Sequence, residues 1–257
     1  MGIEKSFRNS EEILKVSDLV SKCHRKFKTV IVTFQSKVLP GLLEQNLIKP
    51  VEGMELGTAH GKYPIYQLVA NDDILFYLCP IGAPTVVGFL EEVVYSMEIE
   101  NIVLYGTCGI LDKEIATGKI IVPTKAYRDE GTSYHYQEAS DFIDIDKYYV
   151  VSKILSEFNI DYVEGYTWTT DAFYRETKEI YEERKKQGCI AVEMEISAVQ
   201  AFSNLRGVNF YPFIYGADSL DSSSWKKGIL GNLEINERIK YFIVASEIAK
   251  RVSVEEK

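Results

Sequence analysis

Two acidic side chains, Glu193 and Glu195, follow directly after a short apolar run at residues 190–192. The run is typical of the end of a buried strand, and residues 197–205 are typical of a helix that comes after it. Because desolvating an unpaired carboxylate is costly, we expect the two acids either to cap that helix or to bind a ligand. The carboxyl ends of strands in open α/β sheets are also where such proteins bind their ligands.

A glycine-flanked segment at residues 106–109 follows a predicted strand at residues 101–105 and carries the hydroxyl group of Thr107. Such a segment predicts one of two turns. The first is a nest of backbone N–H groups that binds an anion, and the second is a tight turn in which Thr107 bonds only its own backbone. A Gly-x-x-Gly pattern by itself does not decide between them.

Two further side chains come directly after predicted strands. Phe173 follows a strand at residues 162–169, where an aromatic ring usually belongs to the core. Asp218 follows a strand at residues 208–216, and it either caps a turn or acts as a buried acid. Burial raises the pKa of a carboxyl group, so a buried acid can hold its proton near neutral pH.

The composition excludes several classes of protein. The chain has 257 residues, of which 46% are hydrophobic and 26% are charged, as in ordinary globular proteins. A net charge of −9 argues against a surface that binds nucleic acid, and the absence of an apolar run of membrane-spanning length argues against a membrane protein. Four scattered cysteines and three histidines make no metal-ligating pattern, so we expect reduced thiols, no metal site and a cytoplasmic location.

Strands and helices alternate along most of the chain, with hairpins near the start. This order predicts an α/β fold, a three-layer α/β/α sandwich around a mixed central sheet. We expect one domain over residues 1–257, with an N-terminal helical extension over about residues 1–27 whose helix begins at Ser10 and ends near Cys23.

The sequence Val192-Glu193-Met194-Glu195, followed by small residues, resembles the signature of the nucleoside phosphorylase and nucleosidase superfamily. Taken with residues 126–136, residues 168–171 and Asp218, the resemblance covers about residues 30–252 and implies a nucleoside phosphorylase-like fold. It implies that Glu195 binds the ribose hydroxyls, that Met194 packs on the sugar and that Glu193 belongs to the nucleoside site.

The resemblance also implies which residues contact the nucleobase and the phosphate. Phe173 is expected to stack on the nucleobase, and Asp218 is expected to protonate or hydrogen-bond the N7 atom of a purine as it leaves. The glycine turns that contain Gly82 and Gly106, together with Thr107, are expected to contact phosphate.

The chain departs from the family pattern at the positions of three phosphate-binding arginines. The segment after the first strand lacks the family's arginine, and Leu104 and Glu52 stand where the other two are expected. Lys37 and Arg128 are the cations that we expect to substitute for them. The glutamate that activates water in nucleosidases, and the Gln-x-Arg pair that reads uracil in uridine phosphorylases, are missing as well.

The resemblance predicts a pentosyltransferase, a nucleoside phosphorylase of purine salvage that converts a nucleoside and phosphate to a free base and a pentose-1-phosphate. Inorganic phosphate is the expected co-substrate, and no cofactor is expected. The alternatives are a nucleosidase that uses water and a non-catalytic nucleoside-binding protein. The expected assembly is a homo-oligomer: a dimer, a trimer or a hexamer of dimers.

Overall fold

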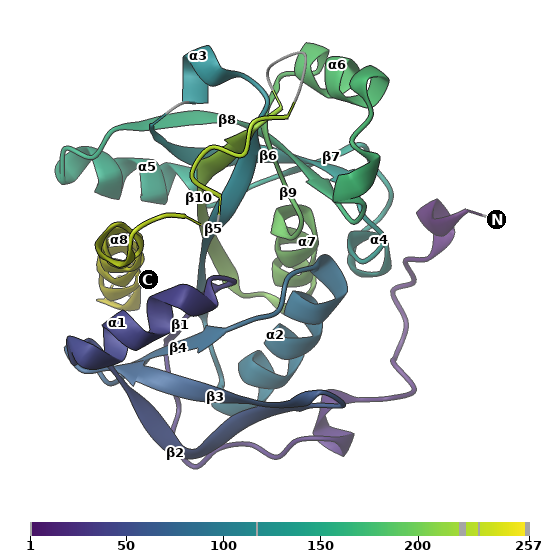
Figure 1. Ribbon diagram of the computed structural model, residues 1–257. Helices are drawn as coiled ribbons and strands as arrows, with labels where there is room; N and C mark the ends of the chain where they lie inside the picture. Colours follow the sequence, from purple (N-terminus) through teal and green to yellow (C-terminus); the bar gives the residue numbers. More distant parts are fainter. Residues whose placement is uncertain (1, 117, 221–224, 231, 255–257) are drawn as a thin grey trace.

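The computed structural model describes residues 2–116, 118–220, 225–230 and 232–254. Figure 1 shows a twisted sheet with helices on both of its faces. The strands are β1 (Thr29–Thr33), β2 (Ile48–Thr58), β3 (Gly61–Leu68), β4 (Ile74–Leu78), β5 (Asn101–Ile110), β6 (Ile120–Asp129), β7 (Phe142–Asp144), β8 (Tyr162–Thr170), β9 (Cys189–Glu193) and β10 (Asn209–Ser219). The α-helices are α1 (Leu39–Glu44), α2 (Ala83–Met97), α3 (Lys113–Ala116), α4 (Ser133–Tyr136), α5 (Tyr148–Glu157), α6 (Lys178–Lys186), α7 (Ile196–Arg206) and α8 (Ile235–Val254).

The sheet has the order β10-β6-β8-β9-β5-β1-β4-β3-β2, β7 pairs with β6, and β10 also pairs with β5. Strand β5 runs parallel to β1 and β10 but antiparallel to β9, so the sheet is mixed, as predicted. One core cluster packs α2 and α7 on one face through Phe89 and Phe202. A second cluster packs α5 and α8 on the other face through Leu155 and Phe242. The predicted three-layer α/β/α sandwich is therefore confirmed.

The segment at residues 106–109 is not a turn, because it belongs to the long strand β5. Both edges of β5 are paired at this end, by β9 on one side and by β10 on the other, so the backbone stays extended. An added Cβ atom at Gly109 would lie 2.8 Å from Leu220 and 2.9 Å from Val192, so these two side chains would have to shift to admit any other residue. The two glycines therefore permit close packing around β5 and do not reverse the chain.

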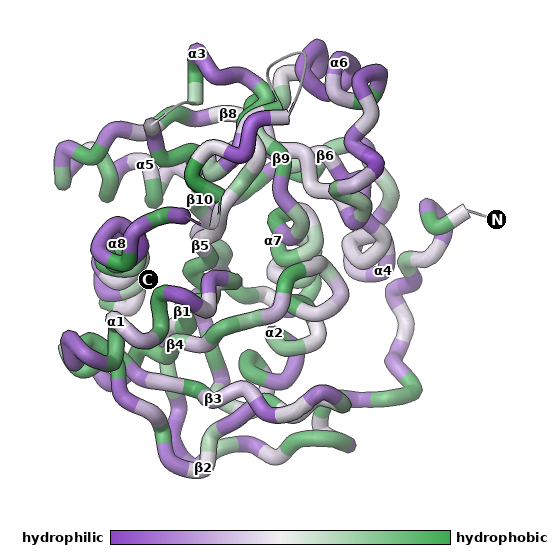
Figure 2. The backbone as a smooth tube through the Cα atoms, in the orientation of Figure 1, coloured by the Kyte–Doolittle hydropathy of each residue, from purple (hydrophilic) through white to green (hydrophobic). Residues whose placement is uncertain are grey.

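The predicted helix over residues 10–23 does not form. Apart from the 3-10 turns Ile3–Lys5 and Val16–Asp18, the described part of the N-terminal segment is irregular, and Figure 1 shows it running along the outside of the molecule. Figure 2 shows hydrophilic and hydrophobic residues mixed along it. Ile13 and Leu14 are exposed, so the segment has no buried apolar face that could stabilise a short helix.

None of the helices in the described ranges combines the length and the hydrophobicity that crossing a bilayer requires.

Candidate active site

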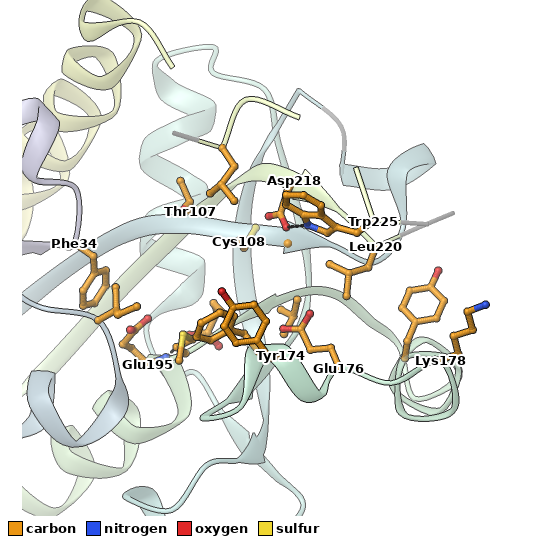
Figure 3. Close-up of a pocket in the computed structure, with 18 residues that line it drawn as sticks. Phe34, Thr107, Cys108, Tyr174, Glu176, Lys178, Glu195, Asp218, Leu220 and Trp225 are labelled. Carbon is orange, nitrogen blue, oxygen red and sulfur yellow. Dashed lines mark hydrogen bonds between the residues drawn. The ribbon is translucent and has the colours of Figure 1, made fainter. Parts of the chain in front are cut away.

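A cavity of about 810 Å³ opens at the carboxyl ends of β5, β8, β9 and β10 (Figure 3). Its volume falls in the range that holds a small-molecule ligand. Six of the side chains predicted from the sequence line it: Thr107, Phe173, Glu193, Met194, Glu195 and Asp218. The mixed sheet thus brings together residues that lie more than a hundred positions apart in the chain.

Glu193 ends β9 and caps the helix that follows. Its Oε2 atom accepts hydrogen bonds from the backbone N–H groups of Glu195 (2.6 Å) and Ile196 (2.7 Å), and Oε1 accepts one from the Thr169 hydroxyl (2.5 Å). Burial raises the pKa of Glu193 to about 7, against these hydrogen bonds, which lower it. The capping interpretation is therefore realised by Glu193, which fixes the backbone of Glu195 at the cavity wall.

Glu195 is the residue just before α7, but its side chain does not cap that helix. Its Oε1 atom accepts a hydrogen bond from the backbone N–H of Gly82 (2.6 Å). Burial, followed by the charge of Glu193, raises the pKa of Glu195 to about 8. A buried carboxyl group with a high pKa on a cavity wall is suited to a ligand that donates hydrogen bonds to it.

Gly82 is placed behind Glu195 and not on the cavity lining. Its backbone has a φ angle of 111°, which is accessible to glycine and strained for other residues. The glycine conformation aims the Gly82 N–H at the Glu195 carboxyl group. The Gly82 N–H therefore positions Glu195 in this structure, and the contact of the Gly82 turn with phosphate stays a prediction.

Asp218 lies within β10, opposite Gly109 of β5, next to an irregularity in the strand register. The indole N–H of Trp225 donates a hydrogen bond to its Oδ2 atom (2.6 Å). Burial raises the pKa of Asp218, while this hydrogen bond lowers it. Asp218 lies within a strand and lines the cavity, a position that is compatible with the predicted acid that faces a ligand.

Two aromatic rings stand at the mouth of the cavity. Phe173 and Tyr174 begin the 3-10 turn Phe173–Arg175, and their ring centroids lie 4.2 Å apart. Phe173 is 45% exposed and Tyr174 is 90% exposed, so neither ring belongs to the core. Exposed rings beside a cavity can stack on a flat ligand without selecting one base.

The residues predicted to bind phosphate are only partly brought together. Thr107 lines the cavity beside Phe34, whereas Gly106 packs against the Phe34 ring and is not on the lining. Lys37 lies exposed in the 3-10 turn Ser36–Val38, just beyond Phe34, and it is not on the lining either.

Arg128 does not reach the cavity. Its guanidinium group is buried and donates hydrogen bonds to the Ser133 hydroxyl (2.9 Å) and to the Glu138 carbonyl oxygen (2.7 Å). It also stacks on the ring of Tyr134, 4.3 Å from the centroid. Arg128 therefore holds the loop between β6 and β7 together, and the structure gives no support to its predicted contact with phosphate.

Comparison with known proteins agrees with this geometry. Residues 28–240 match the model of the family described as "Phosphorylase superfamily". This chain belongs to the phosphorylase superfamily. The resemblance that was predicted from Glu193, Met194 and Glu195 is thereby confirmed.

The relatives of this superfamily member include "Purine nucleoside phosphorylase DeoD-type" from Clostridium novyi, 27% identical over 143 residues, 54% of this chain and 61% of that protein. The protein of the same name from Brevibacillus brevis is 26% identical over 122 residues, 46% of this chain and 52% of that protein. The chain thus spans about half the length of the curated relatives it matches.

Two solved structures with the same fold differ in their named activity. Purine nucleoside phosphorylase from Toxoplasma gondii, in complex with immucillin-H, has a TM-score of 0.72 at 18% identity, covering 90% of this chain and 93% of that one. AMP nucleosidase from Bacteroides thetaiotaomicron has a TM-score of 0.68 at 15% identity, covering 88% and 89%. The fold therefore agrees with both named types of enzyme and does not choose between phosphate and water as the acceptor.

Sequence reasoning missed Glu176 and Trp225, which both line the cavity of this superfamily member. Glu176 follows Phe173 by three positions, and this closeness to a predicted site residue is the signal in the sequence that could have identified it. Trp225 is one of only two tryptophans, but its bond to Asp218 depends on a bridge between Ser219 and Lys226 that no local pattern predicts.

A buried positive charge, also missed, lies behind the Thr107 wall. The Nη1 atom of Arg238, on α8, donates a hydrogen bond to Gln35 Oε1 (2.7 Å), and Gln35 in turn donates to the Tyr215 hydroxyl. Tyr215 is the register partner of Thr107. Within the described part of the chain, the Nη2 atom of Arg238 has no hydrogen-bond partner. Arg238 is thus connected to the strand position beside Thr107 through Gln35 and Tyr215.

Proposed function

We propose that this protein cleaves the N-glycosidic bond of a purine nucleoside and transfers the pentose to inorganic phosphate. The observation that carries the proposal is that Glu195, Asp218 and Phe173, which come from the ends of three different strands, face one cavity. They supply an acceptor for sugar hydroxyls, an acid for the base and a ring for stacking. The relatives named purine nucleoside phosphorylase support the same assignment.

Glu195 is the proposed sugar ligand. A sugar diol donates hydrogen bonds, and a carboxylate accepts them, so binding favours the ionised form of Glu195. Cleavage passes through an oxocarbenium-like state, in which hydrogen bonds to the sugar hydroxyls strengthen as the ring gains positive charge. Glu193 and Gly82 hold the Glu195 segment in place through the contacts described above.

Asp218 is the proposed acid for the leaving base. When the glycosidic bond breaks, its electron pair goes to the base, and N7 becomes basic. A carboxyl group that holds a proton can transfer it there, which typically accelerates such steps by about 10²–10⁴-fold. Burial of Asp218 favours the protonated form, as this role needs.

Phosphate is the proposed acceptor, bound at the end of the cavity where Thr107 and Phe34 lie. The hydroxyl of Thr107 is proposed to donate to a phosphate oxygen, and Lys37 and Arg238 are the proposed sources of positive charge. A specific observation favours water as the rival acceptor: among the described residues of the lining, Lys178 is the one cation. Hydrolysis would need no cation at the Thr107 end.

The products distinguish the two acceptors. We expect ribose-1-phosphate from a purine nucleoside and phosphate, and no free ribose. We further expect Lys37→Ala to raise the KM for phosphate about tenfold, with little change in the KM for nucleoside, because a cation stabilises a bound phosphate by about 1–2 kcal/mol. Steady-state kinetics at varied phosphate measure this effect.

Lys49→Ala, at an exposed position on β2, is the matched control and should leave both KM values unchanged. An unchanged KM for phosphate in Lys37→Ala removes Lys37 from the site. Equal cleavage in phosphate-free buffer with release of free ribose replaces the phosphorylase assignment with a nucleosidase.

A further inference from the structure

Glu176 is an acidic side chain on the cavity lining that has no role in the proposed binding of sugar, base or phosphate. It directly follows the 3-10 turn that carries Phe173, and it is partly buried. Figure 3 shows its carboxyl group directed into the cavity, on the side where Asp218 and Trp225 lie. No hydrogen bond or ion pair joins the Glu176 carboxyl group to another described residue, although Lys178 lines the same cavity.

Glu176 and Asp218 both line the cavity, and Figure 3 shows them on the same side of it. Burial, and then the charge of Asp218, raise the pKa of Glu176 to about 7. The other ionisable side chains on the lining are Cys108 from β5, Tyr174 from the 3-10 turn, Lys178 and Tyr181 from α6, and Glu193 and Glu195 from the β9 end. None of these side chains shifts the pKa of Glu176 as Asp218 does. The two carboxyl groups therefore share one end of the cavity.

A purine presents two polar groups along one edge, N7 and the substituent on C6. With N7 at Asp218 and the ring against Phe173, the C6 substituent is the next polar group that a neighbouring carboxyl group meets. We propose that Glu176 recognises this substituent and thereby sets the preference between 6-aminopurine and 6-oxopurine nucleosides. This inference rests on the proposed function, since it takes the position of the base from Asp218 and Phe173.

The chemistry of the carboxyl group gives the preference a direction. An ionised carboxylate is only an acceptor, so it pairs with a 6-amino group and repels a 6-oxo group. A protonated carboxyl group has an O–H donor, which pairs with a 6-oxo group. Pairing one substituent and leaving the other unpaired in a buried site discriminates strongly between the two. High pH therefore favours adenosine, and low pH favours inosine.

The test is the ratio of kcat/KM for adenosine to that for inosine, measured between pH 6 and pH 8. The titrations of Asp218 and Glu195 affect both substrates and largely cancel in the ratio. We expect the wild-type ratio to rise about tenfold or more over this range, because ionised Glu176 replaces the protonated form. In Glu176→Gln the ratio should be independent of pH, since the amide offers both a donor and an acceptor and does not titrate.

Glu182→Gln, at an exposed position on α6, is the control and should keep the wild-type dependence on pH. A flat ratio in the wild type, or an unaltered slope in Glu176→Gln, overturns the assignment of Glu176. Dissociation constants of adenosine and inosine, measured by calorimetry at pH 6 and pH 8, give the same ratio without turnover. If neither nucleoside is cleaved, the proposed function fails, and these constants alone decide the role of Glu176.

Discussion

Asp218→Asn is expected to lower kcat for a purine nucleoside by about 100-fold or more, with little change in KM. The base leaves with the electron pair of the glycosidic bond, and protonation at N7 lowers the barrier to its departure. The carboxyl group of Asp218 can transfer a proton, while an amide can only hydrogen-bond. Burial of Asp218 raises its pKa and so favours the protonated form that the step needs, although the hydrogen bond from Trp225 acts in the opposite direction. Steady-state kinetics on inosine measure the loss.

The Asp218→Asn protein should fold normally, because the amide oxygen still accepts the Trp225 indole N–H. Asp146→Asn, at an exposed position, is the control for the loss of one carboxylate charge and should retain full activity. Equal kcat values for wild type and a folded Asp218→Asn protein would leave Asp218 with no role beyond holding Trp225.

Glu195→Gln is expected to lower kcat/KM at least tenfold, about 1.4 kcal/mol, with most of the loss in kcat. A carboxylate stabilises the developing positive charge of the ribose ring through the sugar hydroxyls, whereas a neutral amide does so more weakly. The loss should shrink with a substrate that lacks the 2′-hydroxyl group, because one of the hydrogen bonds is then already missing.

The Glu195→Gln protein should fold normally, because the side-chain oxygen of glutamine can also accept the hydrogen bond from the Gly82 N–H. Glu182→Gln on the exposed face of α6 again serves as the control. Unchanged turnover by a folded Glu195→Gln protein would remove Glu195 from the sugar site.

Local sequence patterns were sufficient to predict the three layers and the acidic junction after β9. They were not sufficient to divide the roles of Glu193 and Glu195, because spacing alone fits both capping and ligand binding. The difference between the two acids comes from Gly82, which is far away in the sequence. Its positive φ angle directs its N–H group to the Glu195 carboxyl group, so that Glu195 does not cap the helix. The role of Glu195 therefore depends on a contact with Gly82, a residue that is distant in the sequence.

The differences between prediction and structure come from contacts that the residue pattern does not show. Residues 106–109 have the composition of a turn, but pairing with both β9 and β10 keeps them extended. The N-terminal segment has helix-forming residues around Glu11 and Glu12, but no apolar surface covers Ile13. Arg128 has the charge that phosphate needs, yet the local carbonyl oxygen of Glu138 binds its guanidinium group.

The measurement that tests the central claim most directly is release of free base by the wild-type protein from a panel of nucleosides in phosphate buffer. Inosine, adenosine, guanosine and uridine are incubated separately, and the bases are separated and quantified by liquid chromatography. Because Asp218 is the proposed acid for N7 of a purine, we expect the purine nucleosides to be cleaved faster than uridine. A clear preference for uridine, or release of no base from any nucleoside that binds, would contradict the account.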